Sequence, residues 1–401
     1  MIISSVHQPL TIESAIELTK RLKFFNSNAR LTCKEIGDEI VNLVFHITDS
    51  QNSKGLIIKQ ALPNAEVGGK TWPISLQRAV IETHSLLTNA SYVPTLVPRV
   101  YYFDESLAIT VLEDLSHLTI CRTGLSKGAT YPLLSDHIGT YFARTLFFTS
   151  DFSLEPKVKK GMVQQFVNGD VCKITEELVF TVPFFNDNAN DYEAPLQRDV
   201  DEIRKDVSLK QEVSKLKRKF STQADALIHG NLHTGNIIAS ETETKIINPE
   251  FAYFGPFGYD IGQFIANLLL HAISQQEEGK ETILAHIDNT WNVFMNELAS
   301  LWESDGLEVY TMNEGYLQQL LKQTFEDAIG YAGCELIRRS TGTDPVAGLD
   351  DIYDPHTRIN AKRNGIALGK SLITDRFRIT STKELRKYLE SILQKQIQTQ
   401  Y

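Results

Sequence analysis

The sequence is poor in cysteine and has no excess of positive charge. Its four cysteines, Cys33, Cys121, Cys172 and Cys334, lie far apart and form no CxxC pair. This spacing argues against a disulfide framework and a thiolate zinc site, and it is typical of reduced thiols in a cytosolic protein. The formal net charge of -10 disfavours nucleic-acid and polybasic membrane contacts, because both need clustered positive charge. A small molecule is therefore the expected partner.

Long hydrophobic runs are missing as well. The most apolar stretch, residues 264–273, is about half as long as a membrane span and contains Asn267 and His271. The first 22 residues show no basic start followed by an apolar core, which a signal peptide would have. We therefore expect a cytoplasmic protein without a membrane partner.

The patterning predicts two lobes, as expected for a chain of 401 residues. The first lobe is β-rich, with segments expected as follows: a helix from Thr11 to Leu22, a hairpin within 42–60, a helix at 77–87, and strands at 99–104 and 107–115. From Ser116 onward the periodicity is mostly helical, apart from a short β insert within 226–250. We expect an α+β fold with a nucleotide-binding lobe, residues 1–113, and a larger helical lobe, residues 114–401. This is the layout of a bilobal kinase.

A lysine at the end of the hairpin offers the positive group that phosphoryl transfer needs on the nucleotide phosphates. Lys59 ends the run LIIK, and Glu82 on the next helix is placed to pair with it. A solvated strand lysine explains the local sequence equally well.

The stretch HGNLHTGN, residues 229–236, is typical of a catalytic loop. A strand and a tight turn precede Asn231, and Asn236 follows five residues later, so the first can face an acceptor hydroxyl and the second a metal. The tripeptide NPE begins twelve residues beyond Asn236, across a hairpin, and makes the pattern much more specific. Because asparagine favours turns, a turn-forming role for Asn231 is the alternative. The spacing of His229 and His233 would allow a metal pair, but His229 is expected instead to be a buried hydrogen-bonding residue that holds the loop.

Several segments together resemble the methylthioribose kinases, within the aminoglycoside phosphotransferase and choline kinase group of protein-kinase-like folds. They are EIGDEIVNLVFHI, LIIKQALP, TWP, VLEDLSHL, LEPKVKK, LVFTVPFF, LIHGNLHTG, INPEFAYFGPFGYDIGQFIANLLL and AGCELIRR. The resemblance runs nearly end to end. It implies transfer of the γ-phosphate of ATP to the 1-hydroxyl of 5-methylthioribose in methionine salvage, with Mg²⁺ as cofactor and a homodimer as the assembly.

The resemblance also implies roles for individual residues on the nucleotide side. Asn42 and Lys59 would contact phosphates. Three consecutive residues would form the linker that receives adenine: Glu113, Asp114 and Leu115. The segment Asn248, Pro249 and Glu250 corresponds to a D-x-E metal pair, with Asn236 as a further metal contact.

On the sugar side, Asn231 falls on the aspartate that orients the sugar hydroxyl. Arg338 and Arg339 match an arginine pair near the sugar and the transferred phosphate. Trp72 lines the sugar pocket or fills the lobe interface, and the sequence favours neither. Asp260 matches an aspartate that braces the catalytic loop.

The departures from the family cluster at the chemistry. Asn231 and Asn248 replace carboxylates, and the nucleotide loop reads GDEIVN where the family favours GDGNLN, which introduces Glu39 and Ile40. The chain has GKT before Trp72, where the family tends to have GES, and STGTDPVAGL after the arginine pair. The two amides alone would suit a deliberately inactivated variant, but the other changes favour natural drift.

Loss of a general base costs about 10²–10⁴-fold in rate, and hard cations bind chiefly through charge. We therefore expect severely impaired turnover with partial retention of nucleotide binding. Two alternatives remain open: a pseudokinase that binds nucleotide, sugar or a partner without chemistry, and a kinase for another small hydroxyl compound.

Overall fold

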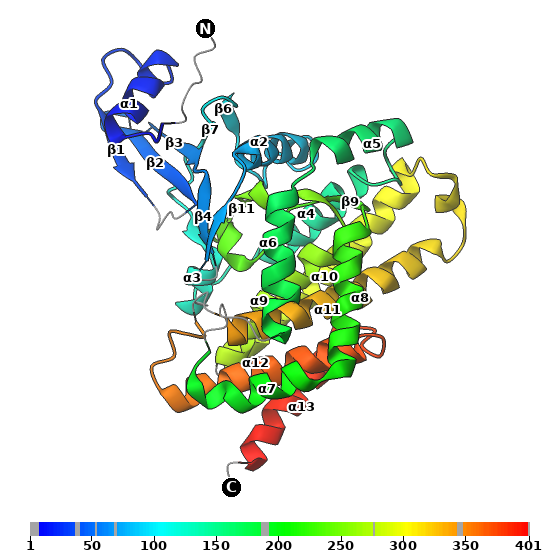
Figure 1. The fold of residues 1–401 in the computed structure, drawn as a ribbon. Helices are drawn as coiled ribbons and strands as arrows, with labels where there is room; N and C mark the ends of the chain where they lie inside the picture. The colour runs from blue at the N-terminus through cyan, green and yellow to red at the C-terminus, as the bar shows by residue number, and fades with distance from the viewer. Residues whose placement is uncertain are drawn as a thin grey trace.

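A computed structural model of the chain describes residues 8–36, 41–52, 54–67, 70–185, 192–275, 277–342 and 348–399. An antiparallel sheet lies at one end of the molecule and the helices form the rest (Figure 1). The sheet has five strands in the order β1-β2-β3-β7-β6. Their bounds are Leu31–Glu35 (β1), Asn42–Asp49 (β2), Lys54–Ala61 (β3), Val100–Asp104 (β6) and Ile109–Glu113 (β7). The hairpin expected within residues 42–60 is thereby confirmed.

One face of the sheet is closed by the first helix, α1 (Ile12–Arg21). Alternate residues of β2 point inward, and Phe45 and Ile47 form an apolar cluster with Ala15 and other residues of α1 and β3. The helix begins with a capping box, in which the N–H of Ser14 donates to Thr11 Oγ1 at 3.3 Å and the N–H of Thr11 donates to Ser14 Oγ at 2.7 Å. The sequence placed this helix start correctly.

The second helix, α2 (Gln77–Ala90), connects the sheet with the helical lobe. It contacts β3, β6 and β7 on one side and the 3-10 turn η4 (Pro249–Phe251) on the other. Glu82 lies in the middle of this helix and is buried. Side chains of α2 are thus held against the segment that follows Asn248.

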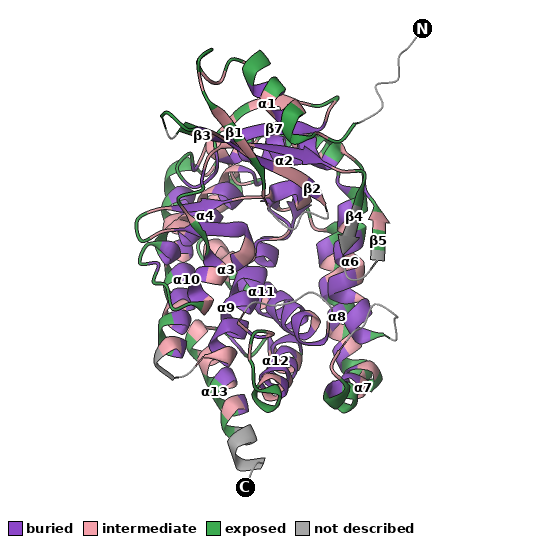
Figure 2. Cartoon of the chain, turned by 90° about the vertical axis from the view of Figure 1, so that its left-hand side faces the viewer, coloured by how far each residue is buried: buried purple, intermediate pink, exposed green. Residues whose placement is uncertain are grey.

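The core of the larger lobe is built around α9 (Gly258–Ser274), which is buried along almost its whole length. It packs against α10 (Glu277–Asp305) and α11 (Tyr316–Thr341), and all-round burial explains why its apolar run shows no clean amphipathic pattern (Figure 2). The other helices are α3 (Cys121–Ser126), α4 (Leu134–Phe148), α5 (Pro156–Gln165), α6 (Gly169–Phe180), α7 (Gln197–Lys205), α8 (Val207–Thr222), α12 (Pro355–Asp375) and α13 (Thr382–Thr399). No helix within the described ranges is long and apolar enough to span a membrane.

Short strands complete the middle of the chain. The predicted insert is confirmed as the hairpin of β10 (Ile237–Ala239) and β11 (Thr244–Ile246). Four other short strands, in addition to β1 of the main sheet, were not expected: β4 (Asn64–Val67), β5 (Lys70–Pro73), β8 (Thr119–Ile120) and β12 (Tyr253–Gly255). With two to four residues each, they are too short to show a period-2 pattern. The strand β9 (Ala226–Ile228) pairs with β12, not with the hairpin.

The α+β fold class with two lobes, a β-rich N-terminal part and a larger helical part, is therefore confirmed.

Candidate active site

The loop 229–236 is held by its backbone. Gly230 has a φ of 78°, and a Cβ there would lie 2.1 Å from the carbonyl oxygen of Phe251. The carboxylate of Asp260, at the start of α9, accepts the N–H of His229 at 2.6 Å and the N–H of Gly230 at 3.0 Å. Burial raises the pKa of Asp260 to about 7, although its backbone donors act in the opposite direction. The brace expected of Asp260 is thus present.

The two histidines of the loop act as hydrogen-bonding residues. His229 Nε2 lies 2.9 Å from the carbonyl of Ile247 and donates to it, so Nδ1 is free to accept the N–H of Asn231 at 3.3 Å. Burial lowers the pKa of His229 to about 4. His233 Nδ1 lies 3.0 Å from both the N–H of Gly235 and Nη2 of Arg122. Across the described residues, no three His, Cys, Asp or Glu side chains are grouped to hold a metal.

Three asparagines that the sequence singled out form a chain of hydrogen bonds. Asn236 Nδ2 donates to the backbone carbonyl of Asn231 at 2.9 Å, and Asn248 Nδ2 donates to Asn236 Oδ1 at 3.2 Å. Lys59 Nζ then donates to Asn248 Oδ1 at 3.0 Å. Asn248 has a left-handed backbone (φ 61°, ψ 47°), a conformation that asparagine and aspartate tolerate better than most residues. The loop, the hairpin end and the N-terminal sheet therefore meet at one point.

Lys59 is not a solvated strand lysine. Its Nζ lies 2.9 Å from Glu82 Oε1, and the two side chains are 7% and 4% exposed. Glu250 Oε1 lies 3.9 Å from the same ammonium. Burial raises the pKa of Glu82, with the Lys59 charge acting against it. The pairing predicted between Lys59 and Glu82 is confirmed.

Arg78 is the residue here that the sequence analysis missed. Its Nε donates to Glu250 Oε2 at 3.0 Å, and its side chain is 1% exposed. It lies four residues before Glu82, so both project from one face of α2, and that spacing was the available signal. Asn42 Nδ2 donates to both Glu250 oxygens at 3.2 Å. Burial raises the pKa of Glu250, but Lys59 and Arg78 together keep it below its ordinary value.

An apolar cavity of about 340 Å³ lies between the lobes beside this cluster. Its lining includes five residues that the sequence had singled out: Lys59, Glu82, Glu113, Leu115 and Asn248. The rest of the lining is mainly aliphatic: Ile36, Val44, Ile57, Leu86, Pro98, Leu112, Ser116, Ile120, Gly235, Ile238 and Ile247. The cavity thus offers an apolar slot that ends at an ammonium group.

Asp114, the middle residue of the predicted adenine linker, is not part of this lining. Its Oδ2 lies 3.0 Å from His46 Nε2, and its Oδ1 accepts the N–H of Ser116 at 3.0 Å. The carboxylate therefore fixes the segment after β7 instead of facing the cavity.

A second cavity, of about 260 Å³, lies on the other side of the loop. Asn231, Glu250, Arg338 and Arg339 contribute to its lining. Both arginines, in the last turn of α11, bind the fully buried Glu335, at 3.1 Å for Arg338 Nη1 and 2.6 Å for Arg339 Nε. The cavity therefore combines the loop asparagine with two guanidinium groups.

Burial, followed by the charges of Arg339 and Arg338, lowers the pKa of the neighbouring Arg122 to about 9. Arg122 therefore still carries its positive charge at neutral pH. The helical side of the site is rich in guanidinium groups.

Two further predicted residues lie at the edges of the site. Trp72 packs with Ile74, Ile174 and Leu178, and the last two line the second cavity, whereas Trp72 itself is not in the lining. Pro249 opens the turn that carries Glu250. Glu39, Ile40, Gly69 and half of the segment after Arg339, residues 343–347, lie outside the described residues.

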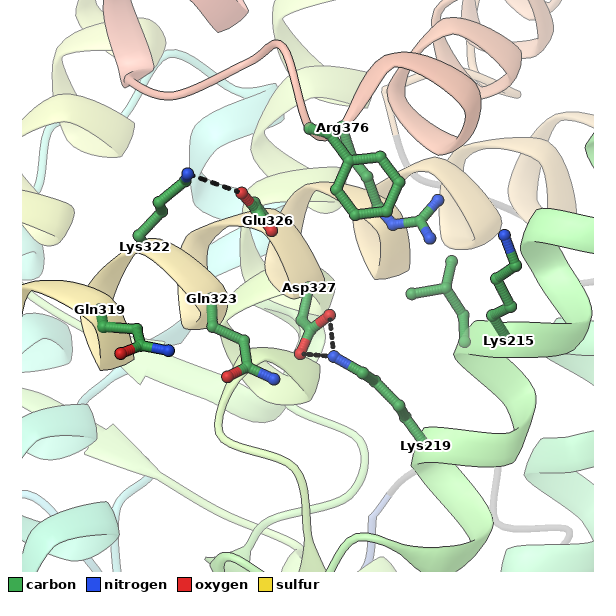
Figure 3. A pocket seen from close by; sticks show the side chains of 10 residues that line it. Lys215, Lys219, Gln319, Lys322, Gln323, Glu326, Asp327 and Arg376 are labelled. Atoms are coloured by element: carbon green, nitrogen blue, oxygen red, sulfur yellow. Dashed lines mark hydrogen bonds and ion pairs between the residues drawn. The ribbon is translucent and has the colours of Figure 1, made fainter. Parts of the chain in front are cut away.

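A larger cavity, of about 430 Å³, shares no residue with these two (Figure 3). It lies where α8 and α11 meet, and its charges are paired within the protein, as in Lys219 with Asp327 at 2.7 Å and Lys322 with Glu326 at 3.9 Å. Nothing in its lining resembles a reactive centre.

Comparison with known proteins gives a consistent result. The chain is 56% identical to a methylthioribose kinase of Geobacillus sp. (strain WCH70) over 382 residues, covering 95% of this chain and 96% of the relative. It is 52% identical to the methylthioribose kinase of Geobacillus thermodenitrificans, covering 96% and 97%, and 52% identical to that of Bacillus cereus (strain G9842), covering 91% and 92%. No family model matches the chain.

Solved structures resemble it more distantly, as in a Plasmodium vivax ethanolamine kinase, with a TM-score of 0.45 and 14% identity over 90% of this chain and 92% of that one. At more than half identity over nearly the whole length, the curated relatives decide the assignment, and the chain belongs to the methylthioribose kinase family.

Proposed function

We propose that the chain binds ATP in the apolar cavity and a methylthioribose-like sugar in the second cavity, with severely impaired phosphoryl transfer between them. The observation that carries this proposal is the chain of three asparagines between the cavities, in which the side chains of Asn248 and Asn236 lead to the backbone carbonyl of Asn231. Asn231, Asn236 and Asn248 stand where the two ligands would meet, and all three are neutral. The geometry favours binding of both ligands but supplies little of the charge that transfer requires.

The nucleotide side is supported by shape and by one cation. An adenine ring suits the aliphatic lining near Leu115 and Glu113, while Lys59 at the far end is placed for phosphate oxygens. We propose residues 1–113 as the nucleotide-binding lobe and residues 114–401 as the lobe that supplies the loop and the sugar contacts.

The sugar side is supported by the arginine pair. Arg338 and Arg339 offer donors to hydroxyl or phosphate oxygens, and Glu335 fixes their positions. Asn231 Oδ1 can accept a hydrogen bond from a sugar hydroxyl and so orient it. A neutral amide cannot take the proton, however, and this loss costs about 10²–10⁴-fold in rate.

The donor set fits Mg²⁺ poorly. Of the three ligands predicted for the metal, Asn236 and Asn248 are neutral and hydrogen-bonded to each other, and the carboxylate of Glu250 is engaged by Arg78 and Asn42. Hard cations require carboxylate charge and open oxygens. We therefore assign no step of the reaction to the metal, and these ligands do not support the Mg²⁺ that the resemblance implies. The homodimer stays a prediction.

Calorimetric titration with a non-hydrolysable ATP analogue, with and without methylthioribose, tests the proposal alongside a coupled turnover assay on the same sample. We expect binding of both ligands and turnover at least about 10²-fold below that of an active relative. Turnover at the rate of the relatives would contradict the impairment. Absence of binding by either ligand would leave the family and the fold without the proposed function.

A further inference from the structure

The contact between Asn248 and Asn236 shows what the amide at position 248 does. Asn236 Nδ2 faces a backbone carbonyl, which only accepts, so its Oδ1 must face Asn248. Lys59 Nζ only donates, so Asn248 Oδ1 faces the lysine and Nδ2 faces Asn236. The orientation of both amides is thereby fixed. An N–H of Asn248 lies directly against an acceptor oxygen at 3.2 Å.

A carboxylate at position 248 would reverse this contact. Two acceptor oxygens would then face each other at the same distance, and they would repel unless a cation lay between them. The amide removes that need, because its own N–H supplies the positive end of a dipole where the cation would lie.

The buried charges around the contact lead to the same conclusion. Among the residues that the structure describes, the cluster holds two cations, Lys59 and Arg78, and two anions, Glu82 and Glu250. Their formal charges cancel without any added ion. Arg78 and Asn42 also engage both oxygens of Glu250, the remaining carboxylate among the predicted metal ligands.

We infer that this site holds no divalent cation, that the side-chain N–H of Asn248 takes the place of one, and that the chain consequently binds nucleotide in a metal-independent manner. The metal-independent binding of nucleotide rests on the proposed function. Two carboxylates at positions 231 and 248 would repel a polyphosphate, and a divalent cation would offset that repulsion. Two amides exert no such repulsion, so metal-free nucleotide loses little by comparison.

The test compares the parent protein with Asn248→Asp by calorimetric titration of AMP-PNP in Mg²⁺ and in EDTA. In the parent we expect the two dissociation constants to agree within about threefold, because the charges already balance. In Asn248→Asp we expect AMP-PNP to bind at least about tenfold more tightly with Mg²⁺ than with EDTA. Asn292→Asp, on the exposed surface of α10, adds the same carboxylate away from the site and is expected to behave as the parent.

A second arm omits the nucleotide and follows the melting temperature as Mn²⁺ is added. We expect no rise for the parent beyond that of Asn292→Asp, and a rise for Asn248→Asp. Mg²⁺-dependent AMP-PNP binding by the parent, or an Mn²⁺-induced rise in its melting temperature, would overturn the inference. The parent alone decides this if Asn248→Asp does not fold. If AMP-PNP binds in neither buffer, the proposed function fails, and the Mn²⁺ arm still decides whether the site holds a cation.

Discussion

Two parts of the site differ in charge: the carboxylate of Asp260, which holds the loop 229–236, and the positions of Asn231 and Asn248, which face the cavities. Asp260 has a carboxylate, which holds the loop by accepting the N–H groups of His229 and Gly230. Asn231 and Asn248 carry amides at the two positions that face the cavities. The loop is thus held by a carboxylate, whereas the two positions that face the cavities carry neutral amides.

In this site the shape of the backbone and the negative charge of the side chains are therefore separable properties. Asparagine and aspartate have nearly the same volume and both tolerate a left-handed backbone, so either residue suits the backbone of position 248. Charge has no such substitute, because a metal ion and a departing proton both require an anion. The shape of the loop therefore does not depend on the negative charge that a metal ion and a proton require.

The largest effect is expected from a variant with carboxylates at both positions, 231 and 248. We expect the double variant Asn231→Asp with Asn248→Asp to raise kcat with ATP and methylthioribose by about 10²–10⁴-fold, since general-base action and metal charge return together. A coupled assay at saturating substrates, with Mg²⁺, measures the change. Each single variant should recover less than the pair, because both groups act on one assembly.

The matched control for this variant is Asn292→Asp, which should leave kcat unchanged. If the double variant stays at the parent rate while folding normally, the two amides are not the main defect. The altered segments, including the one that carries Glu39 and Ile40, would then be responsible.

A second variant changes the shape of the loop 229–236 without changing its charge. Gly230→Ala places a Cβ 2.1 Å from the Phe251 carbonyl at a residue with a φ of 78°, so we expect a loss of about 3 kcal/mol or more in the free energy of unfolding. Urea denaturation measures it. Gly161→Ala in α5 is the control, because its Cβ meets nothing within 4 Å and alanine favours a helix, giving a gain of up to about 1 kcal/mol. Equal effects at the two glycines would show that the loop is not rigidly held.

Much of this site could be predicted from the sequence because it depends on local patterns. The hairpin that carries Lys59, the helix that carries Glu82 and the loop with Asn231 and Asn236 each have a recognisable period or spacing. Arg78 has a helical spacing from Glu82, but the contact that Arg78 makes could not be found in this way. Its partner Glu250 lies 172 residues further along the chain, and no local rule joins an arginine on one helix to a turn in the other lobe.

The same limit applies to the pairing of the short strands and to the partner of Asn42. Pairing of β9 with β12 is decided by the tertiary packing of strands of three residues, which carry no periodic signal of their own. The phosphate contact that the resemblance implies for Asn42 stays a prediction, and in the structure its amide donates to Glu250. A single sequence shows that Asn42 lies at a strand start and does not show which partner its side chain finds.

A third prediction uses pH to separate Asp260 from the rest of the protein. The folded pKa of Asp260 is raised to about 7 from an ordinary value of 3.8, so between these values the folded state binds a proton that the unfolded state has released. Stability from this group is therefore full below about pH 4 and falls as pH rises to 7, by at most about 1.4 kcal/mol per pH unit.

Asp260→Asn should remove this slope, and urea denaturation of both proteins at pH 5 and pH 7.5 measures it. The difference in unfolding free energy, parent minus variant, is expected to become less favourable to the parent at the higher pH. The comparison also cancels the opposite slope from His229, whose folded pKa of about 4 makes stability rise with pH up to about 6.5. An unchanged difference would mean that Asp260 is ionised throughout.

The smallest effect is expected at an ion pair near the surface, outside the loop and the cavities. It gives a reference for the loss of stability expected at Gly230. Glu193 hydrogen-bonds Arg358 at 2.8 Å and pairs with Lys362 at 3.0 Å, and the Arg358 hydrogen bonds, with Lys362 assisting against burial, lower its pKa to about 2. Because the Glu193 side chain is about 30% exposed, solvent partly screens the pair, and Glu193→Gln should cost only about 0.5 kcal/mol at pH 7. The cost should vanish as pH falls from about 4.5 toward 2, where the parent carboxylate takes up its proton. Glu390→Gln on exposed α13 serves as the control. A loss at Glu193 as large as that at Gly230 would mean that a surface ion pair supports the fold as strongly as the braced loop does, and the contrast between scaffold and charge would no longer hold.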